Sequence, residues 1–350
     1  MTQTLRIGER LIGPGQPCFI IAEAGSNHDG RLEQALALID CAAECGADAV
    51  KFQSFTADRL VAKTRHPIAT LTDQFGQFGR TVHEMFLAVE LPPAWLPQLR
   101  DRARARGMLF LSTPFDEISA DQLDELGVPA FKVASYELVH LPLLRHLARK
   151  GKPMILSTGM ADLGEIEEAL EAVRAEGNED VALLHCAIGY PAAPEDAHLA
   201  AMDTMRAAFH VPVGFSDHTL GLAVPLAAVA RGASVIEKHF TLDAKAAGPD
   251  HAFAAEPATL AALVRGIREV ERAIGQPEKR HQPSEELHYH RGRRSVFASV
   301  DIPLGAVITP EMVSVLRPGV GLQPKYLKLL IGRTAKRTIQ AFEPISWNDI

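Results

Sequence analysis

The sequence has no run of apolar residues approaching the roughly 20 that a membrane-spanning helix requires. Its N-terminal stretch also lacks an apolar segment of signal-peptide length. We therefore expect a soluble, cytoplasmic protein without membrane contacts. Basic residues are not in excess, because 36 lysines and arginines face 43 aspartates and glutamates, for a formal net charge of −7. This balance argues against a general nucleic-acid-binding protein, but it leaves room for a local basic pocket that binds an anionic substrate.

Cysteine is scarce, and its spacing argues against a disulfide framework. The four cysteines are Cys18, Cys41, Cys45 and Cys186, and no two of them form a CxxC pair. Reduced thiols are the expected state of such cysteines in the cytosol. Cys41 and Cys45 lie four residues apart on a predicted helix, and we interpret them as core residues rather than as metal or redox ligands.

The sequence also lacks a GxGxxG motif after its first predicted strand, which disfavours an open dinucleotide-binding sheet. Short apolar runs instead alternate with amphipathic segments, several of which end in glycine, as helices commonly do. We predict eight strands, at Cys18–Ala22, Ala47–Gln53, Met108–Thr113, Ala130–Ser135, Pro153–Thr158, Val181–Cys186, Val211–Ser216 and Ser234–Thr241. Eight parallel βα units are the number that closes a TIM (β/α)8 barrel, and a doubly wound open sheet is the alternative.

The pattern changes near Gln276, where the alternation of strands and helices stops. Residues 276–292 are polar, contain two prolines and have few aliphatic side chains, which predicts a linker. Residues 293–350 contain short apolar runs between proline and glycine turns, and they predict a small β-rich domain. Residues 1–275 are left for the barrel. Within them, residues 54–91 form a long connection, which in a barrel would lie over the mouth.

Charged residues stand at or near the carboxyl ends of several predicted strands, although the strands of a parallel barrel are normally apolar. Glu23 follows the first strand, Lys51 lies in the second, Lys132 in the fourth and Glu237 in the eighth. An unpaired buried charge is costly, so these residues should be paired or face a polar cavity. Active sites of TIM barrels lie at these strand ends. We predict that Lys51 and Lys132 bind a phosphate or carboxylate; a Lys51–Glu237 salt bridge and a Schiff base on either lysine are the alternatives.

Hydroxyl groups recur directly after the strands, where they suit either phosphate oxygens or helix caps. They belong to Thr113, Ser135, Ser157, Thr158 and Ser216. Their repetition after strand upon strand favours an anion-binding site over isolated helix caps.

Two histidines follow neighbouring strands and suggest a metal site. His218 comes after the seventh predicted strand and His239 lies near the end of the eighth, with Glu23 and Asp217 nearby. Mixed imidazole and oxygen ligands with open positions suit a divalent ion of the manganese or magnesium type better than a structural zinc.

Taken together, these segments resemble the sialic acid synthase family, in the family's order and over nearly the whole chain. The matching stretches are IAEAGSNHDG (21–30), GADAVKFQ (46–53), STPFD (112–116), FKVASYE (131–137), ILSTGM (155–160), LLHC (183–186), VGFSDHT (213–219), IEKHFTLD (236–243), GPDHAF (248–253), RRSVFA (293–298) and RPGVGL (317–322). The resemblance implies a TIM barrel followed by an antifreeze-like (SAF) domain. It also implies a homodimer in which each small domain covers the partner's barrel mouth.

The activity that the resemblance implies is the condensation of phosphoenolpyruvate with an N-acyl amino sugar, giving a nonulosonic acid and phosphate by C–O cleavage. The cofactor would be a divalent ion, with manganese expected and magnesium or cobalt as alternatives. The implied ligands of this ion are His218 and His239. Residues matching those that bind phosphoenolpyruvate are Lys51, Thr113, Lys132, Ser135, Ser157 and Ser216. Residues matching the reacting centre and further substrate contacts are Glu23, Glu237, Gln53, Tyr190, Asp250 and, from the partner's small domain, Arg317.

The sequence departs from the family pattern at Ile188, where a polar residue near the phosphate is usual, and around Ala254. The expected YPTP reads YPAAP. These changes bear on the substrate, for which N-acetylmannosamine and a 2,4-diacetamido-trideoxyhexose are the candidates. Two other functions remain as alternatives: a Schiff-base aldolase using Lys132 or Lys51, and a glycan-binding or ice-binding protein whose barrel is a scaffold.

Overall fold

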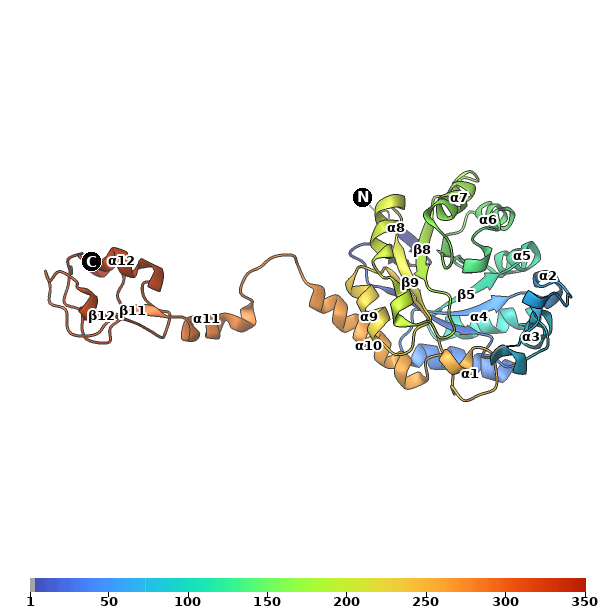
Figure 1. Cartoon of the computed structure of the whole chain (residues 1–350), viewed down its shortest axis with the longest axis horizontal. Helices are drawn as coiled ribbons and strands as arrows, with labels where there is room; N and C mark the ends of the chain where they lie inside the picture. Colours follow the sequence, from blue (N-terminus) through green and yellow to red (C-terminus); the bar gives the residue numbers. More distant parts are fainter. Residues whose placement is uncertain (1–3, 73) are drawn as a thin grey trace. The chain divides into compact units, whose positions relative to one another are not determined.

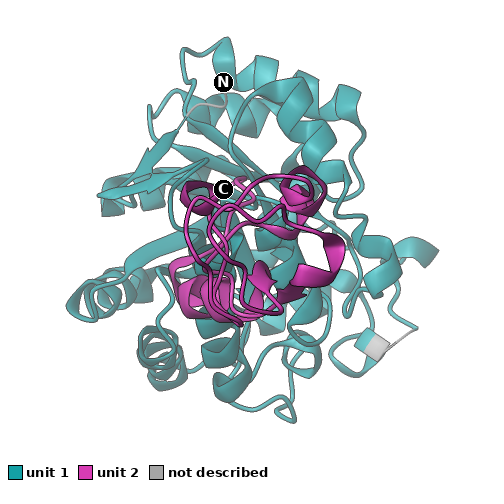
Figure 2. Cartoon of the chain, turned by 90° about the vertical axis from the view of Figure 1, so that its left-hand side faces the viewer, with its two compact units in different colours: residues 1–275 teal, residues 276–350 magenta. Residues whose placement is uncertain are grey.

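The computed structural model describes residues 4–72 and 74–350. The chain divides into two compact units, residues 1–275 and residues 276–350, which have different colours in Figure 2. Each unit has a core of its own and is described by itself. Within the described residues, no helix is both long and apolar enough to cross a membrane.

The first unit is a barrel of eight parallel strands surrounded by helices (Figure 1). The strands are β3 (Phe19–Gly25), β4 (Ala49–Ser54), β5 (Leu109–Pro114), β6 (Phe131–Val133), β7 (Met154–Ser157), β8 (Val181–Cys186), β9 (Val213–Asp217) and β10 (Val235–His239). Hydrogen bonds join them in the order β5-β4-β3-β10-β9-β8-β7-β6, and the two end strands of this order contact each other. Each predicted run overlaps one of these strands, and the predicted TIM barrel is confirmed.

A helix follows each barrel strand and packs on the outer face of the sheet. These helices are α1 (Leu32–Glu44), α4 (Leu96–Ala105), α5 (Glu117–Leu126), α6 (Leu141–Ala148), α7 (Leu163–Arg174), α8 (Ala201–Phe209), α9 (Ala223–Ala230) and α10 (Pro257–Ile274). Their ends follow local sequence signals. The Asp116 carboxylate accepts a hydrogen bond from the Ser119 N–H at 2.8 Å and so caps α5, which Gly127 ends with a φ of 79°.

The long connection within residues 54–91 has regular structure of its own. Its described residues, 54–72 and 74–91, form two short α-helices and two 3-10 helices, α2 (Ala57–Leu60), η1 (Pro67–Ala69), η2 (Gln74–Gln77) and α3 (Val82–Ala88). Short 3-10 helices elsewhere in this unit are η3 (Pro93–Trp95), η4 (Ser135–Glu137), η5 (Pro194–Ala197) and η6 (His251–Phe253).

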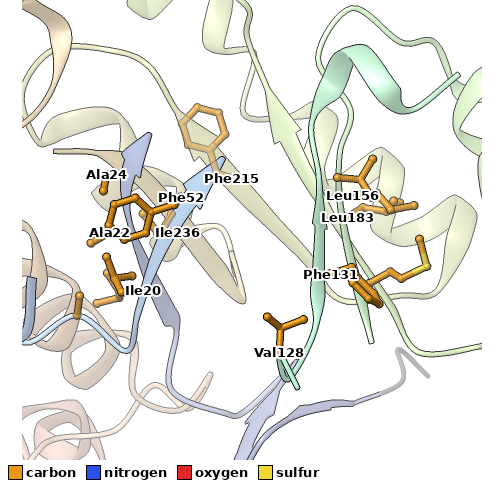
Figure 3. Close-up of a cluster of buried hydrophobic side chains, with 14 of the residues drawn as sticks. Ile20, Ala22, Ala24, Phe52, Val128, Phe131, Leu156, Leu183, Phe215 and Ile236 are labelled. Atoms are coloured by element: carbon orange, nitrogen blue, oxygen red, sulfur yellow. The ribbon is translucent and has the colours of Figure 1, made fainter. Parts of the chain in front are cut away.

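Alternate residues along each barrel strand point either to the helices or into the barrel. The helix-facing cluster includes Ile20, Ala22, Phe52, Phe215 and Ile236, which are labelled in Figure 3. Most buried residues on this face are apolar, as expected for a parallel sheet covered by helices.

Apolar residues of the opposite strand face fill the barrel interior near the amino ends of the strands. They are Phe19, Ile21, Ala49, Leu111, Ala130, Ile155, Ala182, Leu184 and Val235. An antiparallel hairpin of β1 (Leu5–Ile7) and β2 (Arg10–Ile12), absent from our sequence-based prediction, adds Leu5, Ile7 and Ile12 to the same cluster. The hairpin therefore closes the barrel at the end where the strands begin.

Along six strands, the next inward-facing side chain after the apolar cluster is polar. These residues, two places beyond a member of the cluster, are Glu23, Lys51, Thr113, Lys132, Ser157 and Glu237, and all six are buried. The alternation of side chains along a strand thus carries these polar groups into the barrel interior rather than toward the helices.

The second unit is built around a small antiparallel pair, β11 (Ser295–Ala298) with β12 (Val313–Leu316). Its helices are η7 (Pro283–Glu285), α11 (Glu286–Gly292), η8 (Pro310–Met312), η9 (Pro324–Tyr326), α12 (Leu327–Leu330) and η10 (Trp347–Asp349). Isolated β-bridges and a separate apolar core hold the unit together. Residues 276–292, for which the sequence predicts a linker, contain η7 and α11.

The role of the hairpin can be tested by truncating one side chain. Ile7 is fully buried, so Ile7→Ala should lower the free energy of unfolding by about 2–5 kcal/mol. Leu11 lies on the same hairpin but is 40% exposed, so Leu11→Ala should change stability by about 0.5 kcal/mol or less. Urea denaturation followed by circular dichroism measures both changes. Equal unfolding midpoints for the two variants would show that the hairpin is not part of the core.

Candidate active site

A small cavity of about 60 Å³ lies at the carboxyl ends of the barrel strands. Twelve residues singled out from the sequence line it: Glu23, Lys51, Gln53, Thr113, Lys132, Ser135, Ser157, Tyr190, Ser216, His218, Glu237 and His239. The remaining lining residues are Phe115, Ala134, Tyr136, Cys186 and Ile188. The fold thus brings residues from many separate strands into one cavity.

Lys51 lies between two carboxylates. Its Nζ is 2.8 Å from Glu23 Oε2 and 3.9 Å from Glu237 Oε2, and it donates a hydrogen bond to Thr113 Oγ1 at 3.1 Å. The ion pair with Glu237 that the sequence suggested is therefore present but long, and Glu23 is the close partner. Gln53 also donates to Glu23 Oε1, at 2.9 Å.

Lys132 approaches the same carboxylate from another strand. Its Nζ lies 3.8 Å from Glu237 Oε1 and donates to Ser157 Oγ at 2.7 Å and to the Val133 carbonyl oxygen at 2.8 Å. Ser216 Oγ donates to Glu237 Oε1 at 3.2 Å. Glu237 is thus shared by two buried lysines, neither of which it meets at close range.

The two carboxylic acids of the cavity differ in acidity. Burial raises the pKa of Glu23 to about 7, against the opposing effect of Lys51. Burial acts in the same direction on Glu237, but Lys132 and Lys51 outweigh it and lower the pKa of this group. Two nearby carboxyl groups with separated pKa values are typical of an acid–base pair, in which Glu23 can exchange a proton near neutral pH while Glu237 stays ionised.

The lysines differ in the same way. Burial lowers the pKa of Lys132. For Lys51, burial also acts to lower the pKa, but the charges of Glu23 and Glu237 outweigh it and raise the pKa. Lys51 therefore remains a permanent cation, and a bound anion would favour the charged form of Lys132 as well.

The imidazole rings of His218 and His239 lie side by side, with centroids 5.3 Å apart. His218 Nδ1 is 3.0 Å from the Ala187 carbonyl oxygen, which assigns the proton to Nδ1 and leaves Nε2 with a lone pair. His239 Nδ1 is buried without a hydrogen bond and lies 3.8 Å from Asp250 Oδ2. Burial lowers the pKa of both rings, to about 4 for His218, so both are neutral and able to bind a metal ion.

These two neutral imidazoles fit a divalent ion as part of a ligand set. Among residues 4–72 and 74–350, no group of three or more His, Cys, Asp or Glu side chains is arranged to hold a metal ion. An ion here would take its other ligands from substrate or water, as in open catalytic sites. Gly25 keeps this space free, because a Cβ on it would lie 2.8 Å from Asp250 Oδ2 and 3.5 Å from His239 Nδ1.

A second, larger cavity of about 550 Å³ shares six lining residues with the first, among them Gln53, Tyr190 and His239. One wall is apolar and comes from the connection within residues 54–91: Leu60, Val61, Phe75, Val82, Met85, Phe86 and Val89. Asp250 lies on the polar side, where its Oδ2 accepts hydrogen bonds from Ser26 Oγ at 2.9 Å and Ser26 N–H at 3.3 Å. The predicted substrate residue Asp250 is therefore held beside the first cavity.

Comparison with known proteins identifies the family that this chain matches. Residues 38–279 match the NeuB family, and residues 293–350 match the SAF domain. The chain belongs to the NeuB family. The predicted resemblance is thus confirmed, and so is the SAF domain at the carboxyl end.

Several relatives of this NeuB-family chain match it over nearly its whole length. N,N'-diacetyllegionaminic acid synthase from Legionella pneumophila is 42% identical over 342 residues, covering 97% of this chain and 96% of the relative. Pseudaminic acid synthase from Helicobacter pylori is 34% identical, covering 96% and 98%. The crystal structure of spore coat polysaccharide biosynthesis protein SpsE from Bacillus subtilis is 41% identical, covers 99% of both chains and has a TM-score of 0.68.

Arg317 and Ile188 lie in different units of this NeuB-family chain. Arg317 is exposed in the second unit, just after β12, and its predicted role in a partner's site stays a prediction. Ile188 lines the first cavity and packs on Gly159, where a Cβ would come within 2.7 Å of the isoleucine side chain. Ser135 Oγ, which accepts a hydrogen bond from the Gly159 N–H at 2.9 Å, lies at the same contact.

Glu137 is a candidate functional residue that our sequence reasoning missed. It belongs to η4, two residues after Ser135, and lines the larger cavity. Its Oε2 is buried without a hydrogen bond, and burial raises its pKa to about 7. The available signal was its place two residues after the predicted strand Ala130–Ser135, which contains two other site residues, Lys132 and Ser135.

The raised pKa of Glu137 predicts a pH-dependent loss of stability. A folded-state pKa of about 7, above the unfolded value of 4.5, means that the folded chain holds more protons between these values, so stability falls as pH rises through that window. Glu137→Gln removes this loss. The melting temperature of Glu137→Gln minus that of the unchanged chain should therefore be larger at pH 8 than at pH 5. Differential scanning fluorimetry measures both temperatures.

The matched control is Glu168→Gln, at an exposed position of α7. Its melting temperature should follow that of the unchanged chain at both pH values. A pH-independent effect of Glu137→Gln would contradict the predicted proton uptake on folding.

Proposed function

We propose that this chain condenses phosphoenolpyruvate with an N-acyl amino sugar to form a nonulosonic acid and inorganic phosphate. The observation that carries the proposal is the placement of Lys51 and Lys132 on either side of Glu237, in a cavity lined by hydroxyl groups. Two buried ammonium groups that share one carboxylate as their counter-ion favour the binding of a small ligand with high negative charge. Phosphoenolpyruvate carries both a phosphate and a carboxylate.

The hydroxyl groups of the cavity complete the anion site. Thr113, Ser157 and Ser216 each contact a lysine or Glu237 and so are already oriented toward the charged centre. Preorganised donors of this kind stabilise charge without rearrangement during the reaction. Ile188, which replaces the family's usual polar residue, leaves these groups and the two lysines to bind the phosphate.

The proposed chemistry joins C3 of phosphoenolpyruvate to the aldehyde carbon of the open-chain sugar. The aldehyde oxygen takes a proton, for which Glu23 is placed and has a suitable pKa of about 7. Water adds at C2, and the bond from C2 to the phosphate oxygen breaks. One proton of the added water restores Glu23, the other leaves with the phosphate, and the water oxygen remains as the C2 ketone. Lys51 and Lys132 hold the anionic charge throughout.

His218 and His239 are the residues that would hold a divalent ion, for which manganese is the first candidate. When bound, such an ion supplies Lewis acidity at the aldehyde oxygen. His218 is prepared for this role by its hydrogen bond to Ala187, which fixes the tautomer of the ring.

The larger cavity is the proposed sugar site. Its apolar wall from residues 54–91 favours methyl and acetamido groups over hydroxyls, so we favour a 2,4-diacetamido-trideoxyhexose over N-acetylmannosamine. Asp250, Gln53 and Tyr190 offer polar contacts there, and Glu137 provides an unpaired acceptor for an O–H or N–H of the sugar.

A Schiff-base aldolase has one observation in its favour, because burial lowers the pKa of Lys132 as nucleophilic lysines require. The two hydrogen bonds that Lys132 donates, to Ser157 and Val133, favour a charged anion-binding role instead.

The proposed function is tested by phosphate release in a panel of sugars. The chain, phosphoenolpyruvate and Mn²⁺ should release phosphate only when an N-acyl sugar is added, and faster with the diacetamido sugar. His239→Ala should abolish this release, as should removal of the ion with EDTA. Release without any sugar, full activity of His239→Ala, or a covalent lysine adduct trapped by borohydride would contradict the proposal.

We further propose a homodimer in which the second unit of one chain covers the barrel mouth of its partner and presents Arg317 to the acyl group of the sugar. Exposed apolar side chains after the barrel strands support such a cover: Tyr136, Val139, Met160, Leu220 and Leu242. The second unit carries eleven lysines and arginines against seven aspartates and glutamates, although the whole chain is acidic. Opposite charges would favour its docking on the barrel.

Mixing two inactive variants tests this arrangement. Arg317→Ala and His239→Ala should each have low activity alone. Their mixed dimer contains one site with both residues intact, so unfolding and refolding an equal mixture should restore about a quarter of full activity. Phosphate release measures the recovery. No recovery in a mixture that does form mixed dimers would show that Arg317 serves its own barrel or none.

A further inference from the structure

A fully buried ion pair lies behind the candidate active site, on the helix-facing side of the barrel wall. Lys238 Nζ is 2.7 Å from Asp217 Oδ2, and the two residues are 2% and 1% exposed. They are direct neighbours in the register of β10 and β9. Neither lines the small cavity, because they share the strand face of Ile236 and Phe215, which belong to the helix-facing core.

This pair alternates with the residues that face the cavity. Asp217 stands between Ser216 and His218, and Lys238 stands between Glu237 and His239. Any movement of the pair would therefore move both proposed metal ligands through one peptide unit on each side.

The pair is also tied to the turn that follows His218. Asp217 Oδ1 accepts hydrogen bonds from the Thr219 N–H at 2.9 Å and Thr219 Oγ1 at 2.8 Å, and Lys238 donates to the Thr219 carbonyl oxygen. The His218 carbonyl oxygen accepts from the Ala192 N–H at 3.0 Å. The backbone on both sides of the His218 ring is thus fixed by directional contacts.

Stability alone does not account for charges at these positions. Two apolar side chains of similar volume usually serve a buried position at least as well, because desolvation of an ion pair offsets its attraction. Directional hydrogen bonds, in contrast, fix the position of one strand against the next more strictly than apolar packing does.

We propose that Lys238 and Asp217 are positioning residues that set the spacing of His218 and His239 and thereby the affinity of the site for a divalent ion. This inference rests on the proposed function, in which the two imidazoles hold that ion. It adds a role for two residues that touch neither the substrate nor the ion.

The test measures Mn²⁺ binding to the full chain without substrates, by electron paramagnetic resonance of the free ion. Asp217→Asn keeps the shape of the side chain and an oxygen for Thr219, but it removes the charge that pairs with Lys238. We expect its dissociation constant for Mn²⁺ to rise on the order of 10–100-fold, as for other residues that orient metal ligands. The affinity for phosphoenolpyruvate, measured by calorimetry, should fall much less than that for Mn²⁺, because the two cations that bind it, Lys51 and Lys132, lie on other strands, although Ser216 and Glu237 adjoin the pair.

The matched control is Asp48→Asn at the opposite end of the barrel. Asp48 Oδ2 also pairs with a cation, Arg268, at 3.1 Å and accepts from a strand N–H, that of Ile20, at 2.9 Å. The same chemical change there should lower the melting temperature and leave Mn²⁺ affinity unchanged. The double variant Lys238→Met/Asp217→Leu, which leaves no buried charge, should fold and still bind Mn²⁺ weakly.

Three results would overturn the inference. Wild-type Mn²⁺ affinity in either the folded Asp217→Asn chain or the folded double variant would leave the pair with a structural role only. Equal losses of Mn²⁺ and phosphoenolpyruvate binding would indicate general disruption of the barrel. Absence of Mn²⁺ binding by the unchanged chain would instead overturn the metal assignment of the proposed function, and this inference with it.

Discussion

The candidate site depends on the burial of two ammonium groups inside a closed barrel. Lys51 and Lys132 are 3% and 2% exposed, and removing such charges from water is expensive unless opposite charges and hydrogen bonds compensate. Glu23, Glu237 and the surrounding hydroxyls provide that compensation only in part, since Glu237 stands almost 4 Å from both lysines. An anionic ligand would neutralise the remaining positive potential. The two buried lysines therefore cost the fold stability and, for the same reason, favour the binding of an anion.

The barrel tolerates these charges because its interior is divided along its axis. Near the amino ends, inward-facing residues are apolar and pack against the β1–β2 hairpin. One inward-facing position further on, the side chains become polar and meet one another across the barrel. The apolar layer that stabilises the barrel and the polar layer that forms the candidate site therefore follow each other along the same strands. The lysines are held by a rigid apolar base, which fixes their positions better than loops would.

Much of this arrangement could be predicted from the sequence, because periodic apolar runs and charged strand ends are local patterns. Lys51, Lys132, Glu237 and His239 all lie within predicted strands, and the closed barrel brings them together. Other features depend on contacts that no local pattern reveals. The strands of the hairpin have only three residues each, and Asp250 owes its position to Ser26, 224 residues away in the chain. Glu137 lies in a single turn of 3-10 helix, where its burial follows from the surrounding fold and not from its neighbours in sequence.

The β1–β2 hairpin closes the barrel at the amino ends of its strands, on the side opposite to the candidate site. Leu5, Ile7 and Ile12 fill the barrel interior where the strands begin, so a ligand of the two lysines would enter through the mouth. In the proposed reaction, the substrates, the attacking water and both products would all pass through this opening. A sugar seated in the larger cavity would stand in this path, and anything bound beneath it would be trapped until the sugar, or the acid made from it, had left.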